Sequence, residues 1–468
     1  MLDDLTTLLG AGHVLTGNDA SRYGKEWTGD YPSHPRAVLR PGSAQDVAAI
    51  LKYANATGTP VVPVSGNTGL TGGTHAEGAL MLSLERLNKI RDIRPAARVA
   101  VVEAGVVLSS LHDAAAEHDL IFPMTFGARG SCMIGGMLST NAGGSNVLRY
   151  GSTRDLCLGL EVVTPQGEVM DLMTQLHKNN SGYDLRHLMI GAEGTLGIIT
   201  AAVVKLFPAP KVRATAFVGM GSLRDALQLL NILQEESGGA VDAFEFMPAV
   251  YNRRYDAVHP GAALPFEREY PVTIMLELAS TAPRDAEAGP DGSPHLAELL
   301  QRVLMQRLEE GLISEAVVAQ NEAQRTAFWK RREAAGEITF DGNPLVNTDI
   351  ALPLDAVADF MEAMEARLPS FNAGASSFSC AHLGDGNIHY TVSLNRDDPV
   401  LKDSVVEAIE SEAMARGGSF SAEHGVGLSK LSTMARRKDP VALEMMRALK
   451  TTLDPNNILN PGKVLPRS

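Results

Sequence analysis

The chain is poor in cysteine and has no long apolar run. Its three cysteines, Cys132, Cys157 and Cys380, are odd in number and far apart, so no disulfide framework can be read from them. Such sparse cysteine usage is typical of the reducing cytoplasm, where we expect the protein. No stretch of about 18 apolar residues occurs, so we expect nothing to span a membrane. The first residues, Met-Leu-Asp-Asp-Leu, carry acids where a signal peptide has basic residues.

Positive charge is also scarce. The sequence has 41 Lys and Arg residues against 55 Asp and Glu residues, a formal net charge of -14 with His counted as neutral. Proteins that bind nucleic acids carry a basic excess or a basic stripe, so we expect no nucleic-acid partner. Two common phosphate loops, G-x-G-x-x-G and G-x-x-x-x-G-K-[ST], are both absent. Their absence disfavours a nicotinamide-binding Rossmann unit and a P-loop NTPase.

Glycine, in contrast, is abundant and clustered. There are 44 glycines in 468 residues, above the average of about 7%, and they gather in 58–78, 127–151 and 191–197. These clusters lie among apolar residues and lack serine repeats, so they are not flexible linkers. Glycine lets another backbone or a ligand approach the main chain, and a loop such as 65–73 can surround a phosphate with N–H groups. For one cluster alone, a tight turn and a phosphate loop explain the pattern equally well.

Local patterns divide the chain into three parts: 1–210, 211–420 and 421–468. The first part begins as strand, helix and strand, because Ser43 is a good N-cap, 44–57 has a helical apolar stripe, and Gly58 ends it. The second part predicts an antiparallel sheet with helices on one face, an α+β unit. Its predicted elements are strands at 214–219, 240–247 and 271–278, and helices at 222–236 and 294–311.

Five motifs follow one another in a fixed order and are more specific than any single glycine loop. They are Pro-Val-Ser-Gly-Asn-Thr-Gly-Leu-Thr-Gly-Gly at 63–73, the stretch 123–136, Ser-Thr-Asn-Ala-Gly-Gly at 139–144, Tyr150-Gly151, and Gly-Ala-Glu-Gly-Thr-Leu-Gly at 191–197. Together with Asn-Ile-Leu-Asn-Pro-Gly-Lys at 457–463, they resemble the FAD domain of vanillyl-alcohol-oxidase-type flavoproteins. The resemblance implies an α+β fold: a two-subdomain FAD-binding domain at 1–210, an α+β substrate-binding cap domain with an antiparallel sheet at 211–420, and a C-terminal helical segment at 421–468 that returns to the FAD domain.

The same resemblance implies which residues hold FAD. The pyrophosphate is expected along the first loop and the isoalloxazine beside the later motifs. The implied cofactor-binding residues are Ser65, Gly66, Asn67, Thr68, Gly69, Leu70, Pro123, Ile134, Gly135, Gly136, Ser139, Thr140, Asn141, Gly143, Gly144, Gly151, Glu193, Ile199 and Asn460. Many relatives attach the flavin through a histidine in the first loop. This loop has none, so FAD should be bound non-covalently, and His75, outside the loop, is interpreted as a solvated residue.

Two histidines flank a predicted hairpin in the second part. If Asp385 and Gly386 are its two turn residues, His382 faces His389 across the strands, with Cβ atoms about 4.5–5.5 Å apart. Two imidazoles at that separation can share a metal ion. Spacing alone favours a hydrogen-bonded histidine pair in a half-buried sheet. The pair Glu423-His424 is followed by glycines and has no helical or strand period around it. It favours a metal site over a structural histidine pair.

These residues sharpen the resemblance. His382-Leu-Gly-Asp-Gly-Asn-Ile-His389, followed by Glu423-His424-Gly-Val-Gly427, is similar to the metal-dependent D-2-hydroxyacid dehydrogenases, the D-lactate and D-2-hydroxyglutarate enzymes. The resemblance implies that His382, His389 and Glu423 hold a divalent metal, zinc or manganese, and that His424 is the general base. Arg332 resembles the arginine that binds the substrate carboxylate, and its neighbour Arg331 is the alternative, either on a solvated helix face or pointing inward.

The expected reaction oxidises a small D-2-hydroxy acid. Its carboxylate and hydroxyl can chelate a divalent ion, which lowers the pKa of the hydroxyl. An imidazole can accept that proton near neutral pH. The resemblance implies that the hydride moves to flavin N5, which yields the 2-oxo acid. The electrons then pass to an acceptor other than oxygen, such as an electron-transfer flavoprotein, a cytochrome or a quinone.

Three positions depart from the hydroxyglutarate enzymes of this family. Gly336 and Asn347 stand where those enzymes have Thr and Lys, and Thr391 stands where Asn is frequent. A second substrate carboxylate would lose a cationic partner, which favours D-lactate. D-2-hydroxyglutarate remains the alternative, with Lys330 or Arg331 as compensating cations.

Two interpretations from other classes also remain. A metal hydrolase would use the His/His/Glu site and leave the glycine clusters structural, and its purified protein would be colourless. A non-catalytic binding protein of the same fold would be yellow, but no 2-hydroxy acid would bleach it. The sequence leaves the oligomeric state open, and a homodimer is one option.

Overall fold

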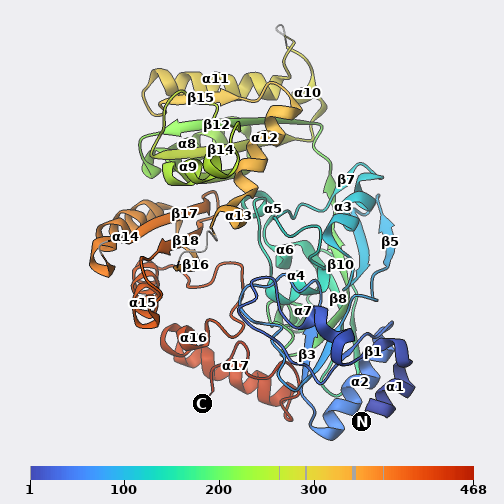
Figure 1. Ribbon diagram of the computed structural model, residues 1–468. Helices are drawn as coiled ribbons and strands as arrows, with labels where there is room; N and C mark the ends of the chain where they lie inside the picture. Colours follow the sequence, from blue (N-terminus) through green and yellow to red (C-terminus); the bar gives the residue numbers. More distant parts are fainter. Residues whose placement is uncertain (1, 263, 290–291, 340–343, 373, 468) are drawn as a thin grey trace.

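The computed structural model describes residues 2–262, 264–289, 292–339, 344–372 and 374–467. Residues 2–208, which we call the flavoprotein-like part, are built on two main sheets and carry a separate seven-stranded sheet domain. The C-terminal helices lie beside the first part, below the seven-stranded domain in the view of Figure 1. None of the helices described is both long enough and apolar enough to cross a membrane. All three cysteines are buried and unpaired.

The flavoprotein-like part contains a four-stranded and a five-stranded sheet, in the orders β1-β2-β4-β3 and β5-β6-β10-β8-β9. Its strands are β1 (Val14–Leu15), β2 (Ala37–Leu39), β3 (Val61–Val64), β4 (Leu80–Ser83), β5 (Ile90–Arg94), β6 (Val99–Glu103), β8 (Cys157–Val163), β9 (Val169–Leu172) and β10 (Ile198–Lys205), with β7 (Leu120–Ile121) paired to β11 (Phe207–Pro208). Its helices are α1 (Leu2–Leu9), α2 (Ala44–Thr57), α3 (Leu108–Ala116), α4 (Ile134–Thr140), α5 (Val147–Tyr150), α6 (Thr153–Leu156) and α7 (Leu185–Met189), with 3-10 turns at Ala11–His13 and Gly17–Tyr23.

The opening strand–helix–strand unit forms as the sequence predicts. Ser43 caps α2 by accepting the backbone N–H of Asp46, and Gly58 ends the helix with a φ of 61°. Both β2 and β3 pair in parallel with β4, which needs the helical crossover that α2 provides. The glycine loop 65–73 follows directly after the last residue of β3, Val64.

The cap domain is built on one antiparallel sheet of order β15-β12-β14-β13-β17-β18-β16. Its strands are β12 (Val212–Met220), β13 (Val241–Pro248), β14 (Val272–Ser280), β15 (Glu315–Val318), β16 (Leu345–Ala351), β17 (Ser376–His382) and β18 (Asn387–Ser393). Its helices are α8 (Leu223–Ser237), α9 (Ala249–Val258), α10 (Pro283–Ala286), α11 (His295–Glu309), α12 (Glu322–Glu333), α13 (Ala335–Thr339), α14 (Val357–Phe371) and α15 (Pro399–Ala415), with a 3-10 turn at Leu354–Ala356.

The prediction that helices cover only one face of this sheet is wrong. Helices α8, α11, α14 and α15 pack on one face, in a core that contains Leu229, Leu300 and Phe360. Helices α9, α12 and α13 pack on the other, where Tyr251 and Phe328 contribute to a second core. The sequence did not predict this second helical layer, because α9 buries tyrosines on either side of two arginines and so lacks an aliphatic stripe.

The predicted register of the β17–β18 hairpin is also wrong. His382 pairs with Asn387, and Cys380 pairs with His389, so residues 383–386 form a four-residue turn. The longer turn is stabilised because Asp385 accepts the backbone N–H of Asn387 through Oδ1, at 3.1 Å. The two histidines still share one face of the sheet, diagonally placed, with ring centroids 5.5 Å apart.

The C-terminal segment, with α16 (Leu431–Arg437) and α17 (Pro440–Leu453), returns to the flavoprotein-like part (Figure 1). Asp439 caps α17 and Pro440 occupies its first turn. Beyond the helix, Val61 of β3 donates its N–H to Ile458 O at 2.7 Å, and Asn460 donates its N–H to Val61 O at 2.8 Å. The segment 457–463 is thereby placed beside the first glycine loop.

Candidate active site

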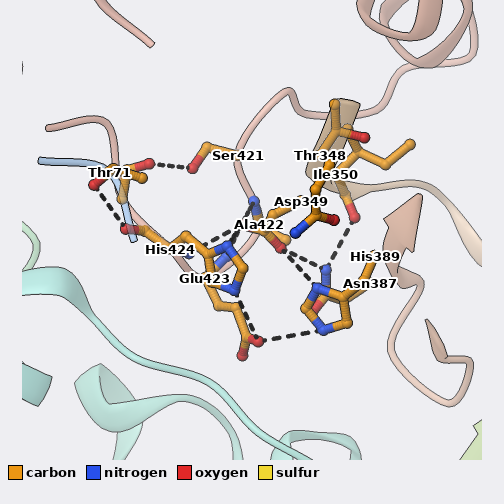
Figure 2. Close-up of polar contacts among 12 residues, drawn as sticks. Thr71, Thr348, Asp349, Ile350, Asn387, His389, Ser421, Ala422, Glu423 and His424 are labelled. Carbon is orange, nitrogen blue, oxygen red and sulfur yellow. Dashed lines mark hydrogen bonds and ion pairs between the residues drawn. The ribbon is translucent and has the colours of Figure 1, made fainter. Parts of the chain in front are cut away.

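The loop that carries Glu423 and His424 is fixed to the cap sheet by a buried carboxylate, that of Asp349 (Figure 2). Asp349 of β16, 2% exposed, accepts the backbone N–H groups of Ala422, Glu423 and His424 through Oδ2, at 3.2, 3.0 and 2.9 Å. Its Oδ1 accepts Nδ2 of Asn387 at 2.9 Å. Burial alone would raise the pKa of Asp349, but the facing histidines and Lys430 hold it well below its usual range.

Four side chains converge at this loop. Ligand-type atoms of Asp349, His389, Glu423 and His424 all lie within 4.8 Å of one another. Glu423 Oε1 is 3.5 Å from His389 Nε2 and 3.8 Å from His424 Nε2, and the two imidazoles stack at 5.4 Å. Burial lowers the pKa of His389 well below its usual value, and the neighbouring His424 lowers it further. His389 is therefore neutral, the form in which imidazole binds a metal.

Asp349 is better suited to orient the cluster than to bind a metal. Its oxygens already accept four N–H groups, three from the loop and one from Asn387. Nδ1 of His389 and Nδ1 of His424 lie 3.9 and 3.8 Å from it, on the side away from Glu423. Carboxylates in this position fix the tautomer and direction of metal-binding or proton-accepting imidazoles.

His382, which was expected in the metal set, lies outside this four-residue group. Its Nδ1 is 3.0 Å from Oε1 of Glu245, its neighbour on β13. Burial disfavours the charged form of His382, but Glu245 outweighs it and raises the pKa. With Nδ1 occupied, Nε2 is the nitrogen left to face a ligand, and the ring stands 5.5 Å from that of His389. His382 could therefore complete a metal site from the edge of the cluster.

Arg332 is the inward-pointing arginine of the pair. Its Nε donates to Glu245 Oε2 at 2.6 Å, and its Nη2 lies 3.4 Å from His382 Nδ1. Arg331 points to the other side of α12, where it contacts Asp256 and the carbonyl of Ala262. Its interpretation as a residue on a solvated face is wrong, because its side chain is 4% exposed and lies over the ring of Tyr255.

Glu245 and Asp349 were missed by the sequence reasoning. Each is an acid at a buried strand position, Phe-Glu-Phe in β13 and Thr-Asp-Ile in β16. A buried acid is stable only with partners, and both acids find theirs in the cluster. An acid at a core position was the one available signal. It names no partner, however, because the partners lie 38 to 137 residues away.

The first glycine loop has the properties of an anion cradle. Across residues 66–71, no backbone N–H donates to another group in the described part of the chain. Gly69 has open space around it, whereas Gly66 packs against the backbone of Ser131. A run of N–H groups that is left without protein partners can bind an anion, so this loop fits the pyrophosphate of FAD. Ser65, Asn67, Thr68 and Leu70 belong to the same loop.

The remaining expected FAD residues fall into two groups. Gly135 and Gly144 pack against protein backbone, at Ala104 and Thr125, so their lack of a side chain serves the fold. Gly143 instead borders the cluster, since a Cβ there would lie 2.6 Å from Glu423 Oε2. Of the others, four lie on α4 and one at its C-cap: Ile134, Gly136, Ser139, Thr140 and, at the C-cap, Asn141. Gly151 is the C-cap of α5, Ile199 lies on β10, and Pro123 lines the cavity between the domains.

Two further residues have surroundings that the sequence did not indicate. The Glu193 carboxylate, expected near the flavin, accepts the backbone N–H groups of Val426 and Gly427 at 2.7 and 2.9 Å. It is therefore committed to the loop of Glu423 and His424. His75, interpreted as solvated, is half-buried, and its Nδ1 is buried with no hydrogen-bond partner among the residues described.

The C-terminal return adds polar groups that suit a bound cofactor. Asn460 donates Nδ2 to Gly73 O and Glu193 O, while its Oδ1 is buried and has no partner within the described ranges. Lys463 donates Nζ to His75 O at 2.7 Å, and burial lowers its pKa to about 8. A buried cation that contacts only carbonyls fits an anionic ligand. The residues present therefore fit FAD.

A cavity of about 660 Å³ separates the flavoprotein-like part from the cap domain. Pro123 and Tyr150 line one wall, and Arg325, Trp329 and Lys330 of α12 line the other. Lys330 thus faces this cavity, while Arg332 faces the histidines. The two faces of α12 serve different spaces.

Comparison with known proteins agrees with this arrangement. Residues 209–464 match the family described as FAD linked oxidases, C-terminal domain, and residues 35–173 match the FAD binding domain. The structure of p-cresol methylhydroxylase with substrate bound shares the fold, with a TM-score of 0.75 at 16% identity over 99% of this chain and 95% of that one. Fold and glycine loops thus define an FAD-linked oxidoreductase of the vanillyl-alcohol-oxidase type.

Two curated relatives narrow the class. The D-2-hydroxyglutarate dehydrogenase of Xanthomonas citri pv. viticola is 37% identical over 453 residues, 95% of this chain and 92% of that protein. The mitochondrial D-2-hydroxyglutarate dehydrogenase of Bos taurus is 36% identical over 468 residues, 99% of this chain and 84% of that protein. The chain belongs to the FAD-linked oxidase family, in the group of D-2-hydroxyglutarate dehydrogenase homologues.

Proposed function

We propose that the protein oxidises a D-2-hydroxy acid to the 2-oxo acid with non-covalent FAD and a divalent metal, zinc or manganese. The observation that carries the proposal is the convergence of His389, Glu423 and His424 within 4.8 Å, directly beside Gly143 of the flavoprotein-like part. Two imidazoles and a carboxylate with open positions are typical of a catalytic metal. We further propose that electrons leave to a flavoprotein, cytochrome or quinone rather than to oxygen.

When bound, FAD supplies a two-electron acceptor and the metal supplies a Lewis acid. In the proposed site, His382, His389 and Glu423 hold the metal. Arg332 binds the substrate carboxylate, because a guanidinium pairs with carboxylates through two N–H groups. His424 accepts the hydroxyl proton at its Nε2, since Asp349 holds the loop and lies on the Nδ1 side of the ring.

Anaerobic bleaching tests this function. Purified protein reconstituted with FAD should be yellow, and D-2-hydroxy acids should bleach its flavin absorbance while their L-isomers leave it unchanged. The stereochemistry follows because the metal, Arg332 and His424 would fix the carboxylate and the hydroxyl of the reacting carbon, and its hydrogen must point towards the flavin. Colourless protein after reconstitution would support a metal hydrolase instead. Yellow protein that neither isomer bleaches would support a binding protein.

The proposed D-lactate preference depends on the strand pair Asn347–Thr391, which lies next to the cluster. Asn347 pairs with Thr391, and both lie two residues from the pair Asp349–His389, on the same face of the sheet. Successive residues on one face are about 7 Å apart. The pair Asn347–Thr391 would therefore face the distal end of a substrate longer than lactate. Asn347 accepts the Thr391 hydroxyl at 3.0 Å, and both side chains are neutral. A three-carbon acid such as lactate would not reach this pair.

A second candidate, D-2-hydroxyglutarate, is favoured by a cation that the sequence did not reveal. Arg254 of α9 lies over the ring of Phe378, 4.6 Å from its centroid, and Nη2 donates to Ser393 Oγ at 3.2 Å. Phe378 pairs with Thr391, so the Arg254 guanidinium lies beside the neutral pair Asn347–Thr391. Lys330 and Arg331 point elsewhere. A distal carboxylate would therefore meet Arg254.

Replacing Arg254 with Met should separate the two substrates. We expect kcat/KM for D-2-hydroxyglutarate to fall about 10- to 100-fold, because a charged hydrogen bond contributes about 1.5–3 kcal/mol. The value for D-lactate should stay within about twofold. Arg253→Met is the matched control, since Arg253 is exposed and pairs with Glu269. Equal losses on both substrates would assign Arg254 to the fold, and an unchanged value for D-2-hydroxyglutarate would leave D-lactate as the preferred candidate.

A further inference from the structure

One short loop is held by two buried carboxylates from different parts of the chain. Asp349 of the cap sheet accepts the N–H groups of residues 422–424. Glu193 of the flavoprotein-like part accepts those of Val426 and Gly427, one on each carboxylate oxygen. Between them only Gly425 is skipped. It has a φ of 79°, and a Cβ there would lie 2.8 Å from Glu193 Oε1. The loop fits only with glycine at this point.

Glu193 is itself rigidly placed. Its N–H donates to Ser139 O at 2.8 Å, and its carbonyl accepts Nδ2 of Asn460 at 2.8 Å. Its φ of 50° is unusual for a residue with a side chain, which indicates that the surroundings impose this conformation. Glu193 therefore joins three segments of the flavoprotein-like part: the helix α4, its own turn and the C-terminal return.

The same loop has two further attachments. Leu428 and Ser429 donate their N–H groups to Thr71 O in the first glycine loop, at 2.8 and 3.1 Å. Lys430 donates Nζ to Ser421 Oγ at 2.9 Å and lies 3.6 Å from Asp349, so it closes the loop on the cap side. The loop thus spans from the cap sheet to the candidate pyrophosphate cradle.

We propose that Glu193 is a positioning residue that sets the distance between the flavin side and the residues Glu423 and His424. The inference rests on the proposed function. Asp349 fixes these two residues to the cap, and Glu193 fixes the following two N–H groups to the part that carries the glycine loops. Hydride transfer requires reacting atoms about 3–3.5 Å apart, so a small displacement of the loop slows it strongly.

Glu193→Gln is the test variant. Glutamine keeps the shape, but one acceptor oxygen becomes an N–H₂ group that faces a backbone N–H. We expect flavin reduction by a D-2-hydroxy acid to slow about 10- to 100-fold, mostly through kcat, because displacing the loop affects transfer more than substrate binding. FAD content, read from absorbance, and flavin reduction by dithionite should match the parent. Asp398→Asn is the control, because Asp398 also accepts two backbone N–H groups, at the distant start of α15.

The outcomes are distinct. If the parent protein is not bleached by any 2-hydroxy acid, the proposed function fails. If the parent is bleached and Glu193→Gln is bleached at the same rate, the positioning role is overturned, even when the variant melts at a lower temperature. Loss of FAD with an unchanged rate per bound flavin would also overturn it, and would make Glu193 a flavin contact. Should Glu193→Gln fail to fold, Glu193→Asp, which keeps both acceptors but shortens the side chain, is judged by the same rates.

Discussion

The variant His424→Asn should reduce its flavin with a D-2-hydroxy acid about 10²- to 10⁴-fold more slowly than the parent protein, the usual contribution of a positioned general base. Asparagine keeps a polar side chain of similar reach to Nδ1 but cannot accept the hydroxyl proton. The backbone N–H of residue 424 still donates to Asp349, so the loop keeps its anchor. The loss should therefore fall on proton removal.

Single-turnover stopped flow under anaerobic conditions measures this rate without the later electron acceptor. FAD absorbance and bound metal should equal those of the parent, since Glu423 and His389 remain in place. His118→Asn is the matched control, because His118 is exposed and lies on the flavoprotein-like part at the end of α3. A variant with full rate would remove His424 from the mechanism and leave proton removal to another group.

Much of the fold could be predicted because its signals are local. The cap of α2 by Ser43, its stop at Gly58 and the cap of α17 by Asp439 each depend on residues within a few positions. Apolar runs likewise predicted β10 and β12. The family resemblance, confirmed by the comparisons, supplied the FAD-linked class.

The hairpin at the site shows where local signals fail. Asp385-Gly386 was taken as a two-residue turn, but the Asp385 side chain accepts the N–H of Asn387, and Gly384 donates its N–H to Phe244 O on a neighbouring strand. These bonds stabilise a four-residue turn instead. A register shift of two keeps each side chain on its face, so His382 and His389 stay together although they do not pair.

The supporting carboxylates could not be predicted for another reason. Glu193 and Asp349 bind backbone N–H groups, and a backbone donor leaves no mark in the amino-acid sequence. Their partners lie 73 to 75 residues away for Asp349 and 233 to 234 away for Glu193. Sequence reasoning thus found His389, Glu423 and His424, the residues of the proposed chemistry. It named Glu193 in another role, beside the flavin, and did not find Asp349.

Removal of the metal should be as damaging as loss of the base. A Lewis acid contributes several kcal/mol to stabilising the alkoxide-like charge, so metal-free protein should reduce its flavin about 10³-fold more slowly. Without a metal, the substrate hydroxyl keeps its high pKa, and His424 alone is too weak a base to remove the proton. The neutral His389 and the carboxylate of Glu423 should bind one zinc or manganese ion per chain.

The experiment is dialysis against a chelator, gel filtration, and measurement of flavin reduction before and after adding zinc or manganese, with elemental analysis at each step. FAD absorbance should persist throughout, because the loop 66–71 would hold FAD through its own backbone N–H groups, and Thr71 contacts the backbone carbonyl of His424 rather than its imidazole. Glu423→Gln is the matched variant. It should bind the metal weakly and respond little to its return, since it loses the only carboxylate of the proposed ligand set. Metal-depleted protein with the full rate would contradict a metal-assisted mechanism and leave proton removal to His424 without a Lewis acid, with Arg332 binding the carboxylate only.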